Sequence, residues 1–327
     1  MNPFKMALPE SVEGAISVLT GTFKDQRILA GGTDLLQEIK EGTQAPPLLV
    51  NLKPIPGLRG IVREERGLVI GALTTLSEVT EHPEILKSYP ALARAAGHAA
   101  TPQIRNVGTV GGNLCQRPRC WYYRHADYAC LKKGGELCYA REGENEFHAI
   151  FDNATCNIIH PSNLAPALMA YGAIAEVALP DGKVKEVALD DFWVTPEEDI
   201  AVENILEPNE VLLRVVLPKG SENPKSYFYE VREKQSYDWA LCTSTVALRM
   251  EGELVKDARI VLGAVAPTPV RRTDLEDMLK GQKVSEDLLK KLGEAAVAEA
   301  TPLRDNKYKL ILVKATLARA LRAAVKA

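Results

Sequence analysis

The stretch Asn106-Val107-Gly108-Thr109-Val110-Gly111-Gly112-Asn113, with the cysteine-rich residues that follow it as far as Cys156, decides the fold. Its glycines let the backbone approach an anion closely, because glycine has no Cβ and tolerates unusual backbone angles. Five of the six cysteines follow within this stretch: Cys115, Cys120, Cys130, Cys138 and Cys156. A backbone anion site beside a group of thiols predicts a phosphate-bearing cofactor next to a metal site.

The bulk composition is that of an ordinary globular protein. The chain has 327 residues, a formal net charge of −3, 46% hydrophobic and 25% charged residues, and such a length predicts about two or three domains. The small net charge gives no field that would hold nucleic acid. The longest apolar runs are shorter than the roughly 20 residues that span a bilayer, and the N-terminus has no apolar signal core. We therefore expect a cytoplasmic protein whose cysteines are thiols or metal ligands and not disulfides.

An earlier glycine pair has the same setting as the one in the opening stretch. Residues 27–30 predict a buried strand that runs into Gly31-Gly32-Thr33-Asp34, and residues 34–40 predict a helix. A strand, a double glycine and a helix start together predict an anion site. A helix over 11–19 precedes this unit, and a strand over 48–52 follows it. Pro54 and Pro56 end that strand and predict a subdomain boundary.

The rest of the chain divides at about residue 192. Before that point the pattern predicts hairpins over 58–71 and 174–187, and helices through Val79, over 89–100 and over 164–171. After it, four longer strands predict one antiparallel sheet, over 211–217, 226–232, 240–250 and 258–265. Three helices near 272–279, 286–299 and 307–325 close the chain.

Three glycine turns follow apolar strands, at Gly31-Gly32, at Gly71 and at Gly111-Gly112. Taken singly, each is more often a tight turn than a phosphate site. None fits the dinucleotide-binding Gly-x-Gly-x-x-Gly pattern or the P-loop pattern, so neither a Rossmann site nor a Walker site is expected.

The two glycine pairs lie eighty positions apart, in Leu29-Ala30-Gly31-Gly32-Thr33-Asp34-Leu35 and Thr109-Val110-Gly111-Gly112-Asn113-Leu114. Together they resemble the paired FAD-binding signature of the medium, flavin-carrying subunit of the xanthine dehydrogenase and carbon monoxide dehydrogenase family. Residues 160–168 resemble a later segment of that family. The resemblance implies an α+β fold of the vanillyl-alcohol-oxidase (PCMH) type. It implies FAD-binding subdomains over 1–56 and 57–190, a cysteine-rich insert at about 114–156, and a C-terminal α+β domain over 191–327.

The resemblance also implies which residues bind FAD. In the first motif they are Ile28, Leu29, Ala30, Gly31, Gly32, Thr33, Asp34, Leu35 and Leu36, with backbone N–H groups as the main donors to the pyrophosphate. Elsewhere they are Gly71, Thr109, Gly112, Asn113, Asn163, Leu212 and Glu230.

Two of these positions depart from the family pattern. The family often has Asp where Asn163 stands, and an Asn side chain still accepts hydrogen bonds through its carbonyl oxygen. Many relatives have Lys where Glu230 stands, so Arg232 or Lys234 would have to supply a positive charge near the flavin.

The cysteine-rich insert leaves two interpretations open on its residues alone. Nine, seven and seventeen residues separate Cys120, Cys130, Cys138 and Cys156, which is not the Cys-x2-Cys spacing of zinc ribbons or ferredoxins. The thiols are either metal ligands or small buried side chains. Neighbouring Arg and Lys residues favour thiolates.

A resemblance also covers the insert. It resembles the insert in the flavin subunits of 4-hydroxybenzoyl-CoA reductase and of a bacterial molybdenum aldehyde oxidoreductase. That resemblance implies that Cys120, Cys130, Cys138 and Cys156 hold a 4Fe-4S cluster. Cys115 is then a spare thiol or a rival ligand, and Cys242 is expected in the core of the last domain.

The implied function is electron transfer within a molybdenum hydroxylase complex. A large molybdopterin-binding subunit and a small subunit with two 2Fe-2S clusters would be the partners, in a heterotrimer or its dimer, without nucleic acid or membrane insertion. Electrons would pass through FAD to or from an external acceptor or donor. No nucleophile–base pair is supported by the sequence. Two alternatives are a stand-alone FAD oxidase with a structural metal in the insert, and a colourless assembly module.

Overall fold

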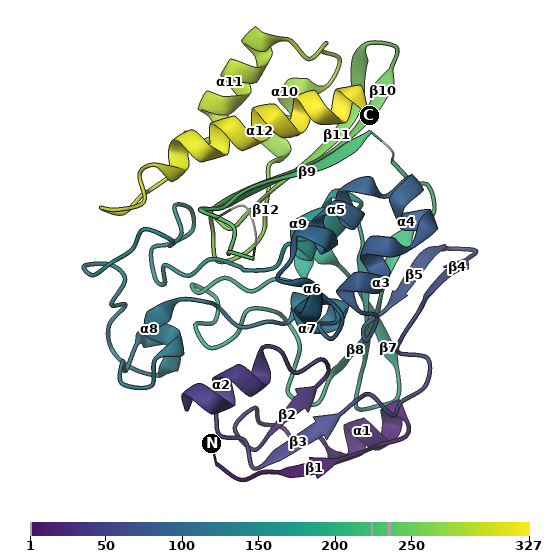
Figure 1. The fold of residues 1–327 in the computed structure, drawn as a ribbon, viewed down its shortest axis with the longest axis vertical. Helices are drawn as coiled ribbons and strands as arrows, with labels where there is room; N and C mark the ends of the chain where they lie inside the picture. The colour runs from purple at the N-terminus through teal and green to yellow at the C-terminus, as the bar shows by residue number, and fades with distance from the viewer. Residues whose placement is uncertain (1, 224, 235–236) are drawn as a thin grey trace.

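A computed structural model describes residues 2–223, 225–234 and 237–327. Its strands form three sheets that follow one another through the molecule (Figure 1). The first sheet lies near the N-terminus, the second lies in the middle, and the third lies under the C-terminal helices. Within the described ranges, no helix combines the length and the apolar character needed to cross a bilayer.

The first sheet is small and parallel. Its order is β1-β3-β2, from β1 (Lys5–Ala7), β3 (Leu48–Asn51) and β2 (Gln26–Leu29). Two helices accompany it, α1 (Val12–Val18) and α2 (Leu35–Glu41). Ser11 begins α1 by accepting a hydrogen bond from Gly14 N at 3.0 Å, as expected of an N-cap serine. The helices and strands predicted in this part are confirmed.

The second sheet is antiparallel and has five strands. Its order is β4-β5-β8-β6-β7. The strands are β4 (Ile61–Glu64), β5 (Gly67–Gly71), β6 (Ile174–Ala178), β7 (Val184–Ala188) and β8 (Val211–Pro218). The two predicted hairpins are confirmed, since β4 pairs with β5 and β6 with β7.

The prediction that residues 211–217 join the C-terminal sheet is wrong. Strand β8 lies between β5 and β6, with Val215 opposite Ile70 on one side and Ala175 on the other. Its apolar residues are buried on both faces, which is typical of a central strand. The sequence predicted that these residues form a strand, but it did not predict which strands lie beside it.

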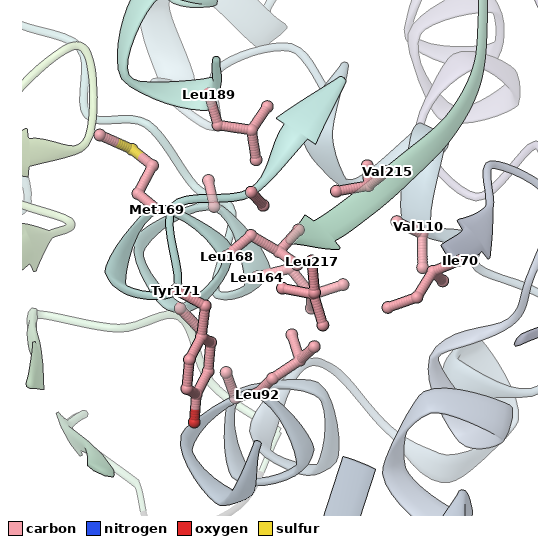
Figure 2. Packing of buried hydrophobic residues seen from close by; sticks show 14 of the residues in the cluster. Ile70, Leu92, Val110, Leu164, Leu168, Met169, Tyr171, Leu189, Val215 and Leu217 are labelled. Carbon is pink, nitrogen blue, oxygen red and sulfur yellow. The ribbon is translucent and has the colours of Figure 1, made fainter. Parts of the chain in front are cut away.

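Helices and short turns cover the second sheet. They are α3 (Leu76–Glu81), α4 (Pro83–Ser88), α5 (Pro90–His98), α6 (Pro102–Arg105), α7 (Val110–Leu114), α9 (Leu164–Ala170) and the 3₁₀ turn η2 (Leu189–Asp191). Figure 2 shows side chains of α5, α7 and α9 meeting those of β5 and β8 in one core. Val110 lies there beside Ile70, so the start of the second glycine motif is fixed against the sheet.

The cysteine-rich insert has little regular structure. It contains only the short helix α8 (Trp121–Arg124) and the 3₁₀ turn η1 (Leu131–Lys133) within its described residues. It lies between α2 and the first turn of α12 (Figure 1). Residues 301–309 are hydrogen-bonded to the later part of the insert. Asn306 Nδ2 donates to His148 O and Ala149 O, and Lys309 Nζ donates to Phe147 O.

The third sheet is antiparallel, in the order β12-β11-β10-β9. Its strands are β9 (Ser226–Val231), β10 (Cys242–Glu251), β11 (Leu254–Gly263) and β12 (Val270–Arg271). The helices α10 (Thr273–Leu279), α11 (Glu286–Ala296) and α12 (Lys309–Lys326) lie on one side of it (Figure 1). The three predicted C-terminal helices and the other three predicted strands of this sheet are confirmed.

Candidate functional site

One cavity joins the two glycine motifs. It has a volume of about 320 Å³ and lies between the first sheet, the second glycine motif and the ends of β8 and β9. Most residues predicted to bind the cofactor line it: Ile28, Ala30, Gly31, Gly32, Thr33, Asp34, Leu35, Thr109, Gly112, Asn113, Asn163, Leu212 and Glu230. A cavity of this size, mostly apolar with a few converging polar groups, is typical of a small-molecule site.

Three residues predicted to bind the cofactor lie away from this lining. Leu29 and Leu36 pack together in a small apolar cluster behind the first motif. Gly71 allows a close backbone approach, since a Cβ there would lie 2.4 Å from Leu58 O. The role of these three residues in binding stays a prediction.

The two glycine motifs touch through their backbones. A Cβ on Gly31 would lie 2.3 Å from Val107 O and 3.1 Å from Gly108 Cα, so only glycine fits there without movement. The N–H groups of Gly32, Thr33 and Asp34 donate no hydrogen bond to other residues in the described ranges. Unpaired backbone donors on a cavity wall fit a pyrophosphate.

The second motif is held by side-chain hydrogen bonds. Thr109 Oγ1 accepts from Gly112 N at 3.1 Å and begins α7. Asn113 Oδ1 accepts from Ser162 Oγ at 2.6 Å. The Ser162 hydroxyl in turn accepts from Ala165 N at 2.9 Å at the start of α9. The segment over 160–168 is thereby fixed against the second motif.

A buried carboxylate lies on the far wall of the cavity. The Glu230 side chain is only 1% exposed. It accepts hydrogen bonds from Asn163 Nδ2 at 3.2 Å and from Arg232, and lies 3.0 Å from His98 Nδ1. The two positions that depart from the family pattern are therefore in direct contact. Arg232, one of the two candidates named from sequence, is a counter-charge of Glu230, and its place near a flavin stays a prediction.

His98 was missed by the sequence analysis. It lines the cavity and is 132 positions from Glu230 in the chain. No local pattern marks it, because it ends the alanine-rich helix α5 as an ordinary last-turn residue. Only the packing of α5 against β9 brings the two side chains together.

The four predicted metal ligands lie in one neighbourhood. Cys130 and Cys138 lie near enough to Cys120 to raise its pKa, although burial is the larger cause and brings it to about 12. The Cys156 thiol donates to the Cys138 sulfur, which lowers the pKa of Cys138 to about 5 and raises that of Cys156. His148 Nε2 lies 3.2 Å from Cys120 Sγ, and Asn157 Nδ2 donates to Cys138 Sγ at 3.2 Å.

These thiols supply suitable donor chemistry but not the geometry of a metal centre. Across the described residues, no group of three or more His, Cys, Asp or Glu side chains is arranged to hold a metal ion. The prediction that Cys120, Cys130, Cys138 and Cys156 ligate a 4Fe-4S cluster therefore stays a prediction.

The other two cysteines lie elsewhere. Cys115 lines the cavity, where burial raises its pKa to about 12. Cys242 is fully buried in β10, which confirms the expected core position. The assignment of Cys115 as a spare thiol or a rival ligand stays a prediction.

A buried ionic group, which no sequence pattern predicted, joins the insert to the cavity wall. Glu203 lines the cavity and pairs with Arg117 Nη1 at 2.9 Å and with Lys132 Nζ at 2.7 Å. Lys132 also donates to Ile200 O at 2.7 Å. Two cations that lie near Cys120 and Cys130 in the chain therefore share one carboxylate, which offsets one of their two positive charges.

Comparison with known proteins agrees with this geometry. Residues 2–220 match the FAD binding domain in molybdopterin dehydrogenase, and residues 227–324 match the CO dehydrogenase flavoprotein C-terminal domain. The chain belongs to the FAD-binding medium subunits of the xanthine dehydrogenase and CO dehydrogenase family. It is thus a FAD-dependent oxidoreductase subunit of the molybdenum hydroxylase type, with an α+β FAD-binding fold.

Individual relatives match over almost their whole length. The aldehyde oxidoreductase FAD-binding subunit PaoB of Escherichia coli (strain K12) is 33% identical over 299 residues, 90% of each chain. The carbon monoxide dehydrogenase medium chain of Hydrogenophaga pseudoflava is 29% identical over 326 residues, covering 98% of this chain and 96% of that one. A solved structure of carbon monoxide dehydrogenase from the same organism superimposes with a TM-score of 0.77 at 27% identity, covering 99% and 97% of the two chains.

Proposed function

We propose that this chain is the FAD- and 4Fe-4S-binding electron-transfer subunit of a molybdenum-cofactor oxidoreductase of the aldehyde oxidoreductase, xanthine dehydrogenase or hydroxybenzoyl-CoA reductase type. Electrons would pass between the 2Fe-2S clusters of a small partner subunit and an external acceptor or donor. A large partner subunit would bind the molybdopterin cofactor and the organic substrate. The observation that carries the proposal is the single cavity lined by both glycine motifs.

The residues of the cavity have separate tasks in this proposal. When bound, FAD supplies one- and two-electron redox chemistry. The unpaired N–H groups of residues 32–34 would bind its pyrophosphate, and Asn113 and Asn163 would bind hydroxyl groups. The apolar side chain of Leu212 would exclude water. Glu230, held by Arg232 and His98, would fix the local charge, a property that tunes a bound cofactor.

The cluster half of the proposal rests on the donor set. Four thiols within one neighbourhood, with an amide donor to one sulfur, fit an iron–sulfur site with four cysteine ligands in chemistry. Their side chains would have to turn away from one another to surround a cluster, and the contact between Cys138 and Cys156 would be replaced by bonds to iron.

The domain division is also a proposal. The boundaries at residues 56 and 190 rest on the sequence. The position of β8 inside the second sheet supports moving the second boundary into the link between β8 and β9, near residue 220.

An anaerobic UV–visible spectrum, with iron and acid-labile sulfide assayed on the same sample, tests both cofactors. We expect flavin bands, a broad iron–sulfur absorbance and about four irons per flavin. Cys130→Ser should remove the iron and keep the flavin. Cys242→Ser, in β10 and outside both the cavity lining and the group of four thiols, is the control and should keep both.

The other outcomes separate the alternatives. Flavin with zinc in place of iron, and turnover of a small substrate by the isolated chain, would favour a stand-alone FAD oxidase with a structural metal. A colourless protein would contradict the FAD assignment itself.

A further inference from the structure

The Asp34 side chain connects the first glycine motif to the cysteine-rich insert. Asp34 directly follows Gly31-Gly32-Thr33 and precedes α2, but its carboxylate does not cap that helix. It faces the insert instead. Asp34 Oδ2 accepts from Arg117 N at 2.8 Å, and Asp34 Oδ1 lies 2.6 Å from Arg124 Nη2 and 2.9 Å from Arg119 Nη2.

All three partners belong to the loop that carries Cys120. Arg119 precedes Cys120 directly, and Arg124 N donates to Cys120 O at 2.9 Å. Arg124 Nε also donates to Pro118 O at 2.7 Å. One carboxylate therefore fixes the backbone on both sides of a proposed cluster ligand. The Asp34 side chain is 15% exposed, so these charged hydrogen bonds are only partly screened by water.

A second contact one turn along α2 holds the same loop. Tyr123 OH donates to Glu38 Oε1 at 2.8 Å, and Arg117 Nε donates to Tyr123 OH at 2.9 Å. Glu38 is 1% exposed, and burial raises its pKa. The loop around Cys120 thus rests on α2 at two points, while the residues just before α2 form a wall of the cavity.

We propose that Asp34 is a positioning residue that couples FAD binding to the order of the loop around Cys120. FAD would hold the backbone of residues 32–34, and the Asp34 carboxylate would hold the loop. Because linkage is reciprocal, a loop held in place also keeps the first motif in its FAD-binding form. The part of this inference that concerns the cluster rests on the proposed function. The part that concerns FAD rests on the cavity lined by both glycine motifs and on the match to the FAD-binding family.

Amide hydrogen exchange of the full chain tests the coupling without any reference to iron. We expect FAD to slow exchange over residues 117–124 in the wild type by about 5- to 150-fold, the usual range of coupling between two sites. Asp34→Asn keeps the size of the side chain and removes its charge, and should lose most of this slowing. Lys40→Ala, on the exposed side of α2, is the matched control and should behave as the wild type.

A second variant guards against a folding defect in the motif itself. Arg124→Gln leaves residues 31–34 unchanged and removes the partner at 2.6 Å. It should lose the FAD-dependent slowing as Asp34→Asn does, with an unchanged far-UV spectrum. The inference would be overturned if FAD slowed amide exchange over residues 117–124 as strongly in both variants as in the wild type. It would also be overturned if FAD did not slow this exchange in the wild type.

Iron and sulfide content separates this inference from the proposed function. A wild type without iron contradicts the proposed cluster, and the exchange result still decides the coupling. If the wild type holds iron, Asp34→Asn should hold several-fold less than Lys40→Ala. Equal iron in these two variants would contradict the assigned positioning of Cys120.

Discussion

Replacement of Gly31 by alanine tests whether FAD binding requires the two glycine motifs to touch. A Cβ on Gly31 would lie 2.3 Å from Val107 O, whereas real Cβ atoms essentially never approach another heavy atom closer than 3.0 Å. One backbone must therefore move by at least 0.7 Å, the difference between these distances. Overpacking of this kind costs about 1–3 kcal/mol, which corresponds to a loss of about 5- to 150-fold in affinity.

The cost should fall mainly on the FAD-bound state. Without FAD the two motifs can separate slightly and relieve the contact, whereas a cofactor that contacts both motifs forces them together. Fluorescence titration of the FAD-free chain gives the dissociation constant, and thermal unfolding gives the stability of the free chain. The control is Gly21→Ala, where an added Cβ meets nothing within 4 Å. A Gly31→Ala dissociation constant within about twofold of the control would refute the reasoning, because it would place less than about 0.5 kcal/mol on the contact.

Two further predictions concern buried charges. Burial lowers the pKa of Lys309 from 10.5 to about 7, so between these values the unfolded chain binds more protons and the free energy of unfolding should rise with pH. This rise should shrink in Lys309→Met when both proteins are melted over that range, and parallel curves would contradict it. Asn163→Asp places a second carboxylate beside buried Glu230, and two like charges about 4 Å apart repel by about 4 kcal/mol at an effective dielectric constant near 20. We expect Asn163→Asp to lower the melting temperature and the double variant Asn163→Asp with Glu230→Lys to restore it. Melting temperatures of both variants equal to that of the wild type would contradict the assigned contact.

The local features of the fold were predictable from sequence because they depend on near neighbours. Ser11 begins a helix since its hydroxyl accepts a hydrogen bond from a backbone N–H three residues on. The glycine pairs were recognisable because two adjacent glycines stand out in the sequence, although the backbone that approaches Gly31 belongs to Val107, 76 positions away. Strand β8 was assigned to the wrong sheet, because its apolar run reports burial and not which strands lie beside it. The regular elements were thus predicted better than their pairing.

The site itself divides in the same way. Both glycine motifs were visible as patterns, since each depends on residue types at short spacing. The group of four thiols was named through a resemblance, because its spacing alone left metal ligation open. The Asp34–Arg124 pair joins residues 90 positions apart, and the buried Glu203 pairs span a similar gap to Arg117 and Lys132. Ion pairs between residues so far apart along the chain leave no periodic signal in the sequence. In the sequence, their charged residues cannot be told from charged residues that are exposed to solvent.

The two departures from the family pattern are best understood as one change. Taken separately, Asn163 removes a negative charge from the cavity wall and Glu230 exchanges a positive charge for a negative one. The structure places their side chains 3.2 Å apart, so a charge change at one position is expected to alter the environment of the other. A buried carboxylate needs a counter-charge and hydrogen-bond donors, and Arg232, His98 and Asn163 supply them. We therefore expect Asn163→Asp and Glu230→Lys to be tolerated together better than either change alone.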